Sequence, residues 1–434
     1  MLNFKFWFTP LFILLLGFSS TAQAQRTITI IRGYDDPFQI SVVPFLWQSD
    51  GAAPSEMHDI ISANLERTGQ FEALPPSEML GWPARAEGLV FRDWRLLNQD
   101  YVVIGRAERI SQGQFEVTFE LYDPFSERRL VGRVLTGESH QWRQIAHRIS
   151  DIIYEEITGV RGVFSTQIAY VAIEQLAETR RHSLFVADAD GENERILVSS
   201  PRPLMSPAWS PDGRQLAYVA FAPDASSEVH VVDLQSGQSR ILIQRQGAIN
   251  SAPAFSPDGR RLAYTSSRDG AANIYVLDLR TGRSQQVTRH WAIDTEPDWI
   301  DNQNLVFTSG RSGRPQIYRI RIGDDQAERL TFEGRYNARP RVSANGDRLV
   351  MVHNDGSGFH IATMDIQSRL MMVLTSSPQD EAPSLAPNDS MVVYSSMHDG
   401  RSRLAWVSID GMVESVMPSR FGNVREPAWS PFTR

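Results

Sequence analysis

A phrase of the form x-P-x-(Trp/Phe)-S-P-D-G recurs along the last two-thirds of this chain at a nearly constant interval. Its prolines, called the blade prolines below, are separated by 46, 44, 43, 43 and 44 residues and are Pro207, Pro253, Pro297, Pro340, Pro383 and Pro427. A period of about 40–50 residues with several short strands is typical of one blade of a β-propeller. Because propellers are rigid platforms around a central channel, the repeat favours a binding function over a catalytic one.

One repeat unit, Ser251–Thr288, shows how a blade of four strands arises. Ser256-Pro257-Asp258-Gly259 has the composition of a tight turn, since Pro presets φ, Asp bonds its own backbone and Gly tolerates positive φ. Four strands are therefore predicted, one around Pro253–Phe255 before this turn and three after it, at Leu262–Ser266, Asn273–Asp278 and Gln285–Thr288.

The second strand of the unit occurs six times, at Ile168–Ala172, Leu216–Ala220, Leu262–Ser266, Leu305–Ser309, Leu349–His353 and Val392–Ser396. The first copy has no S-P-D-G phrase before it. The last phrase, Pro427–Pro431, has no such strand after it. The two incomplete units complement each other, so we expect the C-terminal strand to complete the first blade and close a six-bladed ring without an open edge strand.

The chain begins with the features of an export signal. Lys5 precedes an apolar-rich run of 13 residues, Phe6–Phe18, and Ala22-Gln23-Ala24 fits a cleavage site before Gln25. The run is too short to span a bilayer comfortably, and no later segment approaches 18 uninterrupted apolar residues. We therefore predict that residues 1–24 are a signal peptide cleaved between Ala24 and Gln25, and that the mature chain is exported without inserting into a membrane.

Composition excludes several kinds of chemistry and partner. The chain has no cysteine, which rules out disulfides, thiolate catalysis and Cys-ligated zinc. Lys5 is its only lysine, so the predicted mature chain carries 42 Arg against 51 Asp and Glu, a formal charge near −9. A negative chain has no electrostatic attraction for phosphate backbones, so nucleic acid is not an expected partner.

Residues 25 to about 160 lack the repeat and predict an α/β domain. Strands are expected at Gln39–Phe45, Tyr101–Gly105, Gln114–Tyr122 and Leu130–Leu135, and helices at Ser55–Arg67 and Ser139–Thr158. The second helix leads directly into the repeats. We therefore predict a two-domain protein, with an N-terminal tail at residues 25–36, an α/β domain at 37–160 and a six-bladed β-propeller, closed by the C-terminal strand, at 161–434.

The predicted tail is an alternating strand-former at the free mature N-terminus. It is separated from the α/β domain by Gly33–Pro37 and consists of Gln25, Arg26, Thr27, Ile28, Thr29, Ile30, Ile31 and Arg32. Such a segment can pair inside its own chain as an edge strand, or it can add to the sheet of another protein. The sequence leaves both alternatives open.

The order of signal peptide, small α/β domain and six S-P-D-G-type blades resembles the TolB family over essentially the whole chain. The stretches that carry the resemblance are Val42–Phe45, Pro203–Gly213, Ala252–Gly259, Thr295–Trp299, Pro383–Asn388 and Pro427–Pro431. The resemblance implies a monomeric periplasmic protein of the Tol–Pal system, whose channel mouth holds the outer-membrane lipoprotein Pal and whose tail engages inner-membrane TolA. It further implies indirect links to TolQ and TolR, and roles in envelope integrity and in outer-membrane invagination at cell division.

The Pal-binding candidates follow from the expectation that the innermost strands line the channel. They lie within three positions before a blade proline and are Met205, Ala252, Asp294, Thr295, Glu296, Arg339, Glu381, Ala382, Arg425 and Glu426. The set leans acidic and lacks aromatic residues, which suits an inserted protein segment better than a sugar. The family often carries His where this chain has Ile249, so the chain departs from the family pattern there.

An enzyme is the main rival class. Propellers cap peptidases of the prolyl-oligopeptidase type, but the chain has no G-x-S-x-G and no hydrolase-sized segment after its last blade. The S-x-D-x-G-x-x-W boxes of sialidases are also missing, because Gly follows Asp directly in the repeat. We therefore predict no catalytic residues and no enzymatic activity.

Metal and cofactor sites are likewise not predicted. The nine His residues include no H-E-x-x-H motif, and His140 and His147, seven positions apart on the predicted helix, are expected to be solvated. Asp188–Glu192 resembles the start of an EF-hand loop. The equivalent positions in two other blades, Asp233…Gly237 and Asp278…Gly282, have the pattern of hairpin turns. We therefore predict that Asp188–Glu192 is also a hairpin turn and not a metal-binding loop.

Overall fold

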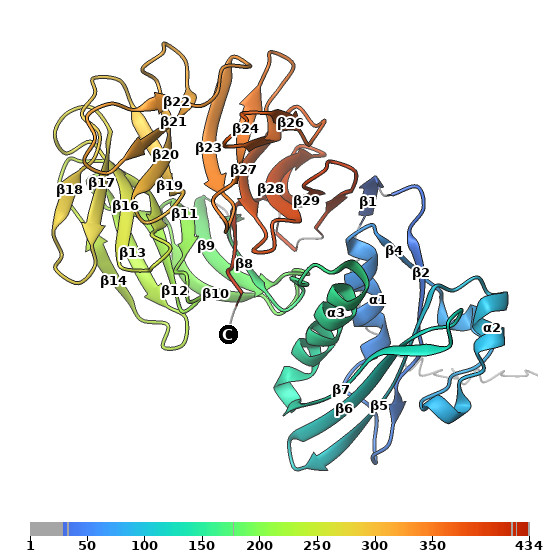
Figure 1. Ribbon diagram of the computed structural model, residues 1–434. Coiled ribbons are helices and arrows are strands. Elements are labelled where there is room, and N and C mark those ends of the chain that lie inside the picture. The colour runs from blue at the N-terminus through green and yellow to red at the C-terminus, as the bar shows by residue number, and fades with distance from the viewer. Residues whose placement is uncertain (1–28, 33, 177, 418–419, 422, 433–434) are drawn as a thin grey trace, which may run out of the picture.

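The computed structural model describes residues 29–32, 34–176, 178–417, 420–421 and 423–432 (Figure 1). The predicted signal peptide, its cleavage site at Ala24 and Gln25, and tail residues 25–28 lie outside these ranges. No helix of the described part is long and apolar enough to cross a membrane.

The N-terminal part of the chain forms a mixed sheet with helices on both faces (Figure 1). Its strands are β2 (Phe38–Val42), β3 (Leu46–Trp47), β4 (Phe71–Ala73), β5 (Tyr101–Ser111), β6 (Gln114–Asp123) and β7 (Arg128–Glu138). Their order is β4-β2-β5-β6-β7, with β3 also on β5; β2, β3 and β4 make parallel pairs, and β5, β6 and β7 are antiparallel.

Alternation along the central strand β5 explains why helices cover both faces. Val103 lies in the core under α1 (Met57–Arg67) and α3 (Trp142–Thr158), whereas Val102 and Ile104 lie under α2 (Phe91–Leu96). Short 3₁₀ turns at η1 (Pro76–Glu78), η2 (Ala86–Gly88) and η3 (Ser139–Gln141) complete the domain. Gly159 ends α3 in the left-handed conformation, with φ of 73°, as its sequence position predicts.

The predicted elements of this region exist, with shifted ends. The expected strand Gln39–Phe45 is shorter, and the strands expected from Tyr101 and from Leu130 are longer, because their hairpin partners extend them. The sequence reading missed α2 and β4, which are too short to show a period. The predicted boundary at residues 160 and 161 stays a prediction.

The second part of the chain is a ring of six β-sheets, which confirms the predicted propeller (Figure 1). Blade 1 contains β31 (Asn423–Trp429), β8 (Gln167–Leu176), β9 (Thr179–Asp188) and β10 (Arg195–Ser200). Blade 2 contains β11 (Leu204–Trp209), β12 (Gln215–Phe221), β13 (Ser227–Asp233) and β14 (Ser239–Ile243). Blade 3 contains β15 (Asn250–Phe255), β16 (Arg261–Ser266), β17 (Asn273–Asp278) and β18 (Ser284–Gln286).

The remaining blades repeat this order from the channel outward. Blade 4 contains β19 (Asp294–Trp299), β20 (Asn304–Ser309), β21 (Gln316–Arg321) and β22 (Glu328–Arg329). Blade 5 contains β23 (Tyr336–Val342), β24 (Arg348–Asn354), β25 (His360–Asp365) and β26 (Met371–Val373). Blade 6 contains β27 (Asp380–Leu385), β28 (Met391–His398), β29 (Arg401–Ser408) and β30 (Glu414–Val416), and it gains β1 (Thr29–Arg32) as a fifth strand.

The C-terminal strand closes the ring as predicted. β31 pairs antiparallel with β8, so the last strand of the chain is the innermost strand of blade 1. The repeated tryptophan ties neighbouring inner strands together, because Trp209 Nε1 donates to the Ala428 carbonyl at 2.8 Å and Trp299 Nε1 to the Ala254 carbonyl at 2.9 Å. These bonds account for the tryptophan two places after the blade proline in blades 2 and 4, whereas Phe255, at the same place in blade 3, has no N–H to donate.

The α/β domain contacts one end of the ring, at blades 1 and 6. Arg143 of α3 pairs with Asp190 of blade 1 at 2.5 Å, and Gly69, after α1, lies so close to blade 6 that a Cβ there would be 2.6 Å from Val413. Asp190 lies in the turn after β9 and Val413 in the turn after β29, the third strands of their blades, and these turns are at the same end of the ring as the S-P-D-G turns that follow the inner strands. The inner strands begin at the opposite end of the channel, which we call the mouth, and the α/β domain leaves that end open.

Candidate functional site

Each of the six inner strands carries a β-bulge beside its blade proline. The residue before the proline is left-handed in every blade, with φ between 49° and 55°, although none of the six is glycine: Ser206, Ala252, Glu296, Arg339, Ala382 and Glu426. Left-handed backbone at non-glycine residues costs energy, and such strain persists where the surrounding structure enforces it. The six bulges therefore lie at one level of the channel wall, where they change the direction of the inner strands and of their side chains.

The predicted Pal-binding set lies along this wall but differs in accessibility. Glu381 and Arg425 are exposed, and Ala252, Asp294 and Ala382 are buried. The other five members are half-buried: Met205, Thr295, Glu296, Arg339 and Glu426. Ser206 holds the bulge position of blade 2, so Met205 lies one residue outside the ring that the other bulge residues form.

Arg339, on the inner strand of blade 5, joins the inner strands of blade 4, next to it, and of blade 1, two blades away. Its guanidinium lies 3.0 Å from the Glu296 carboxylate of blade 4 and 2.9 Å from the Glu426 carboxylate of blade 1. The nearby Glu426 carboxylate raises the pKa of Arg339 above its ordinary value. Glu296 also accepts hydrogen bonds from the Thr308 hydroxyl at 2.8 Å and the Arg339 backbone N–H at 3.0 Å, so its carboxylate holds the wall together.

Asp294 and Asp380 start the inner strands of blades 4 and 6 and have different surroundings. Asp294 is fully buried and pairs with Arg311 at 2.7 Å. Asp380 is also fully buried but faces hydroxyls instead of a cation, and burial raises its pKa to about 6. The carboxylate of Asp294 is therefore held inside the blade, away from a partner.

The rim of the mouth carries apolar side chains, of which the sequence analysis singled out Ile249 and missed Trp291 and Ile293. Trp291 is 81% exposed, and Ile293 and Ile249 are 60% and 56% exposed. Trp291 and Ile293 border a cavity of about 450 Å³ that also reaches Thr295, Glu296 and Tyr336. All three lie in loops between blades. The signal for Trp291 and Ile293 in the sequence was the largely apolar stretch His290–Ile293, which has no strand pattern.

The tail strand β1 lies on the outer edge of blade 6. It pairs antiparallel with β30, with Thr29 opposite Val416 and Arg32 opposite Glu414. Of the two alternatives that the sequence left open, the described part of the tail takes the internal one, and its host is the propeller. The next residue described, Tyr34, has a pKa of about 12, raised by burial and by its hydrogen bond to Asp410.

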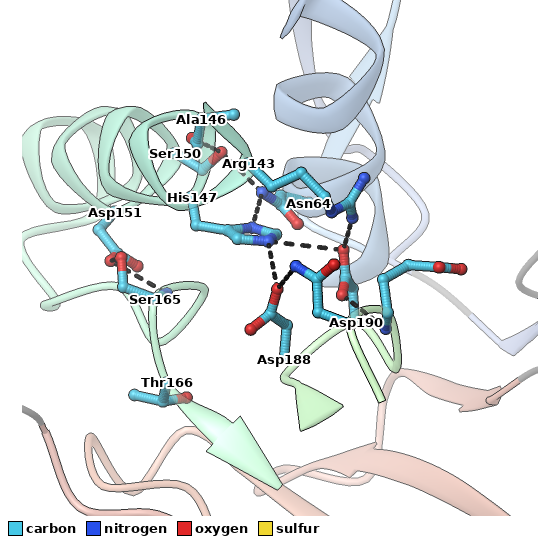
Figure 2. Close-up of polar contacts among 12 residues, drawn as sticks. Asn64, Arg143, Ala146, His147, Ser150, Asp151, Ser165, Thr166, Asp188 and Asp190 are labelled. Atoms are coloured by element: carbon cyan, nitrogen blue, oxygen red, sulfur yellow. Dashed lines mark hydrogen bonds and ion pairs between the residues drawn. The ribbon is translucent and has the colours of Figure 1, made fainter. Parts of the chain in front are cut away.

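One group of side chains in the described part of the chain has the composition of a metal site: His147, Asp188 and Asp190 (Figure 2). The expectation that His147 is solvated is wrong, because this side chain is only 2% exposed. It faces the β9–β10 turn of blade 1, a partner that the pattern of its own helix cannot reveal. His140 is exposed, as expected.

Together these features define a two-domain β-propeller protein with a polar channel wall and an apolar rim. A family model described as the TolB amino-terminal domain matches residues 26–130, and a model described as the TolB beta propeller domain matches residues 154–433. The chain belongs to the TolB family.

Close relatives match the chain from end to end. The Tol-Pal system protein TolB of Xanthomonas campestris pv. campestris (strain B100) is 42% identical over 430 residues, covering 98% of each chain. The protein of the same description from Xanthomonas oryzae pv. oryzae (strain MAFF 311018) shows the same identity and coverage. The crystal structure of TolB from Acinetobacter baumannii superposes with a TM-score of 0.86 at 36% identity, covering 94% of this chain and 100% of that one.

Proposed function

We propose that this chain is a periplasmic component of the Tol–Pal system that holds the lipoprotein Pal at its channel mouth and engages TolA through its N-terminal tail. The relatives named above carry the description Tol-Pal system protein, which supports the assignment to that system. In this role the protein links the outer membrane to the TolQ–TolR motor through TolA. It thereby supports envelope integrity and outer-membrane invagination at cell division.

The observation that carries the proposal is the rim of the mouth. The indole of Trp291 is 81% exposed and borders a cavity of about 450 Å³. An exposed aromatic side chain of this kind is typical of a residue that becomes buried when a protein partner binds. The wall below it is polar and contains the Glu296–Arg339–Glu426 ion pairs. Exposed aromatic and aliphatic anchors are enriched at protein–protein contacts, and a catalytic site would not need them.

Glu381 is the best site for a charge reversal. It is exposed and lies one residue from the bulge of blade 6. Glu296 is less suitable, because its reversal would also remove the contacts to Thr308 and Arg339. We therefore expect Glu381→Arg to weaken Pal binding without unfolding, and Glu296→Arg to lower both binding and stability.

Calorimetry with the purified soluble domain of Pal tests the proposal. Glu381→Arg and Trp291→Ala should each weaken binding by tenfold or more, which corresponds to about 1.4 kcal/mol. Trp82→Ala is the matched control, since this indole is 64% exposed on the α/β domain, away from the mouth. Unchanged Pal affinity in both mouth variants would contradict the proposal.

The tail is proposed to act as a conditional strand for TolA. In the described structure its edge is taken by β30, so TolA has to compete with blade 6 for the same backbone groups. Blade 6 also carries Glu381 and Ala382 on its innermost strand, so one hydrogen-bonded sheet runs from the mouth to the tail. A contact at the mouth can therefore bias tail docking, and linkage requires the reverse effect.

A variant lacking residues 25–32 tests this arrangement when binding of TolA and of Pal is measured by calorimetry. We expect TolA binding to be lost and Pal affinity to change. TolA binding that persists in full would reject the tail as its site. Lost TolA binding with unchanged Pal affinity would keep the tail site and reject the coupling.

A further inference from the structure

The turn between β9 and β10 of blade 1 differs from its counterparts in other blades. In blades 2, 3 and 5 the turn begins with Asp233, Asp278 or Asp365, and each carboxylate accepts a backbone N–H of its own turn at 2.7–2.8 Å. Blade 1 has Asp188 at this position and a second carboxylate at Asp190. These two carboxylates face away from the ring, toward α1 and α3 of the α/β domain (Figure 2).

Four side chains of the α/β domain surround the two carboxylates. Arg143 and His147 come from α3, and Asn64 and Arg67 from α1. The Arg143 guanidinium pairs with Asp190 at 2.5 Å. Arg67 is 6% exposed and also lies over the Trp406 ring of blade 6, 5.5 Å from its centroid, so it contacts the second blade that the α/β domain touches. We call these six residues the clamp.

The hydrogen bonds of Asn64 determine which nitrogen of His147 carries the proton. Arg67 can only donate, and its Nη2 lies 2.6 Å from Asn64 Oδ1. The Ser150 hydroxyl donates to the Ala146 carbonyl, so it accepts from Asn64 Nδ2. The amide nitrogen of Asn64 therefore faces His147 Nδ1, at 2.9 Å, and Nδ1 is the acceptor.

The neutral imidazole of His147 consequently has its hydrogen on Nε2. This N–H is directed at the carboxylates of Asp188 and Asp190, whose oxygens lie 3.7 and 3.6 Å from Nε2. A metal ion would need the lone pair of Nε2, and it would meet two guanidinium groups that already balance the two carboxylates. The group with the composition of a metal site is therefore a set of donors from one domain facing acceptors of the other.

The clamp is incompletely satisfied in the docked arrangement. His147 Nε2, Arg67 Nε and Arg143 Nε are buried and have no hydrogen-bond acceptor among the described residues. Each buried donor without an acceptor has lost its hydration without compensation. Burial also lowers the pKa of Arg67, which shows that its cation is held there at a cost.

The connection between the domains is, by contrast, well bonded. Asp151 of α3 accepts the backbone N–H of Phe164 at 2.7 Å and of Ser165 at 3.2 Å, and it also accepts the Ser165 hydroxyl. Val163 lies in the core of blades 1 and 6, whereas Phe164 lies in the core of the α/β domain. A side chain at Gly162 would place its Cβ 2.5 Å from Asp151 Cα, so the connection fits closely against α3.

We propose that the clamp sets the orientation of the α/β domain on the propeller, and that the clamp separates first when this domain moves while the connection at residues 162–165 stays bonded. Separation returns three buried donors and the Asp190 carboxylate to water, whereas bending the connection would break satisfied hydrogen bonds. The clamp is thus a device for interdomain movement, and it is independent of which partner the mouth binds.

Spin labels report the separation directly, because the chain has no cysteine of its own. Cysteines are introduced at Val134 on β7 and Gln285 on β18, both exposed, and the distance distribution is measured by double electron–electron resonance. Asp188→Asn and Asp190→Asn should each add a second, longer-distance population to the single one of the parent. Asp233→Asn, at the same turn position of blade 2, is the control and should leave the distribution unchanged. An unchanged distribution in both clamp variants and in their combination would overturn the proposal.

The protonation of His147 is tested by long-range ¹H–¹⁵N spectra of its ring at neutral pH, with and without added Zn²⁺. We expect Nε2 to be protonated, Nδ1 to be unprotonated, and the spectrum to be insensitive to Zn²⁺. The opposite tautomer, or a Zn²⁺-dependent shift of both ring nitrogens that is matched by Zn²⁺ binding lost in His147→Gln, would overturn the assignment of donors and acceptors.

Discussion

The indole Nε1–H of Trp429 donates to the hydroxyl of Thr166 at 2.8 Å, joining residues 263 positions apart. Thr166 precedes the first strand of the propeller and Trp429 ends its last, so this bond joins the two ends of the ring. The Trp429 backbone N–H also donates to Ser384 of blade 6 at 2.9 Å. One residue therefore connects blade 1 with blade 6 as well as closing blade 1.

Removing residues 427–434 should destabilise the whole propeller, because the loss opens blade 1 on its channel side. Trp429→Ala is the finer test, and truncation of a buried Trp costs about 3–5 kcal/mol. The exposed Trp291 supplies the control, since Trp291→Ala should leave stability unchanged. Thermal unfolding measures both, and a Trp429→Ala melting temperature equal to that of the parent would argue against closure by this strand.

Asp380→Asn should stabilise the protein at neutral pH. The pKa of Asp380 in the folded protein is about 6, above the ordinary 3.8, so the fold favours the protonated carboxyl. The stabilisation that this protonated form provides is fully present below pH 3.8 and is lost as the pH rises through about 6. The shift corresponds to about 3 kcal/mol at pH 7.5. Asparagine fits the position, because Asn250 and Asn337 lie three residues before the blade proline in blades 3 and 5.

Denaturant unfolding at pH 4 and pH 7.5 checks this expectation. The stability gain of Asp380→Asn should be small at pH 4 and largest at pH 7.5. Asp294→Asn is the control with the opposite sign, because it leaves Arg311 without its ion-pair partner at neutral pH. An equal effect of Asp380→Asn at the two pH values would show that ionisation of Asp380 is not what limits stability.

Arg339→Met should destabilise the protein by about 3 kcal/mol, because it leaves two half-buried carboxylates without their shared cation. The double variant with Glu426→Gln should recover part of this loss, since one of the two unpaired charges is then absent. Chemical unfolding of the two single variants and the double variant measures the coupling. Additive effects would mean that the Arg339–Glu426 pair contributes nothing to the channel wall.

The repeat allowed the propeller, its blade number and its closure to be predicted, because each blade is a local unit with its own turn chemistry. Ser256, Asp258 and Gly259 illustrate this, since the Ser256 hydroxyl donates to Asp258 at 2.6 Å and Gly259 has φ of 69°. The period then fixes how such units follow one another. No contact between distant segments is needed for that inference.

The unpredicted features depend on contacts between segments that are remote in sequence. The position of His147 in its helix predicts a solvent-facing side chain, and only the structure shows that the blade 1 turn covers it. The tail has an alternating pattern that fits any sheet edge, and only the fold shows that its host is β30. The exposed Trp291 follows no strand or helix period, so a search restricted to strand ends passes over it.

Hydrogen exchange of the protein with and without the soluble domain of Pal tests the central claim most directly. If the mouth holds Pal, added Pal should slow exchange in the rim and inner-strand segments 289–296 and 380–382. The S-P-D-G turns at 210–213 and 256–259, at the opposite end of the channel, should exchange as before. Protection confined to those turns, or none at any of these segments in a complex shown to form, would contradict the account.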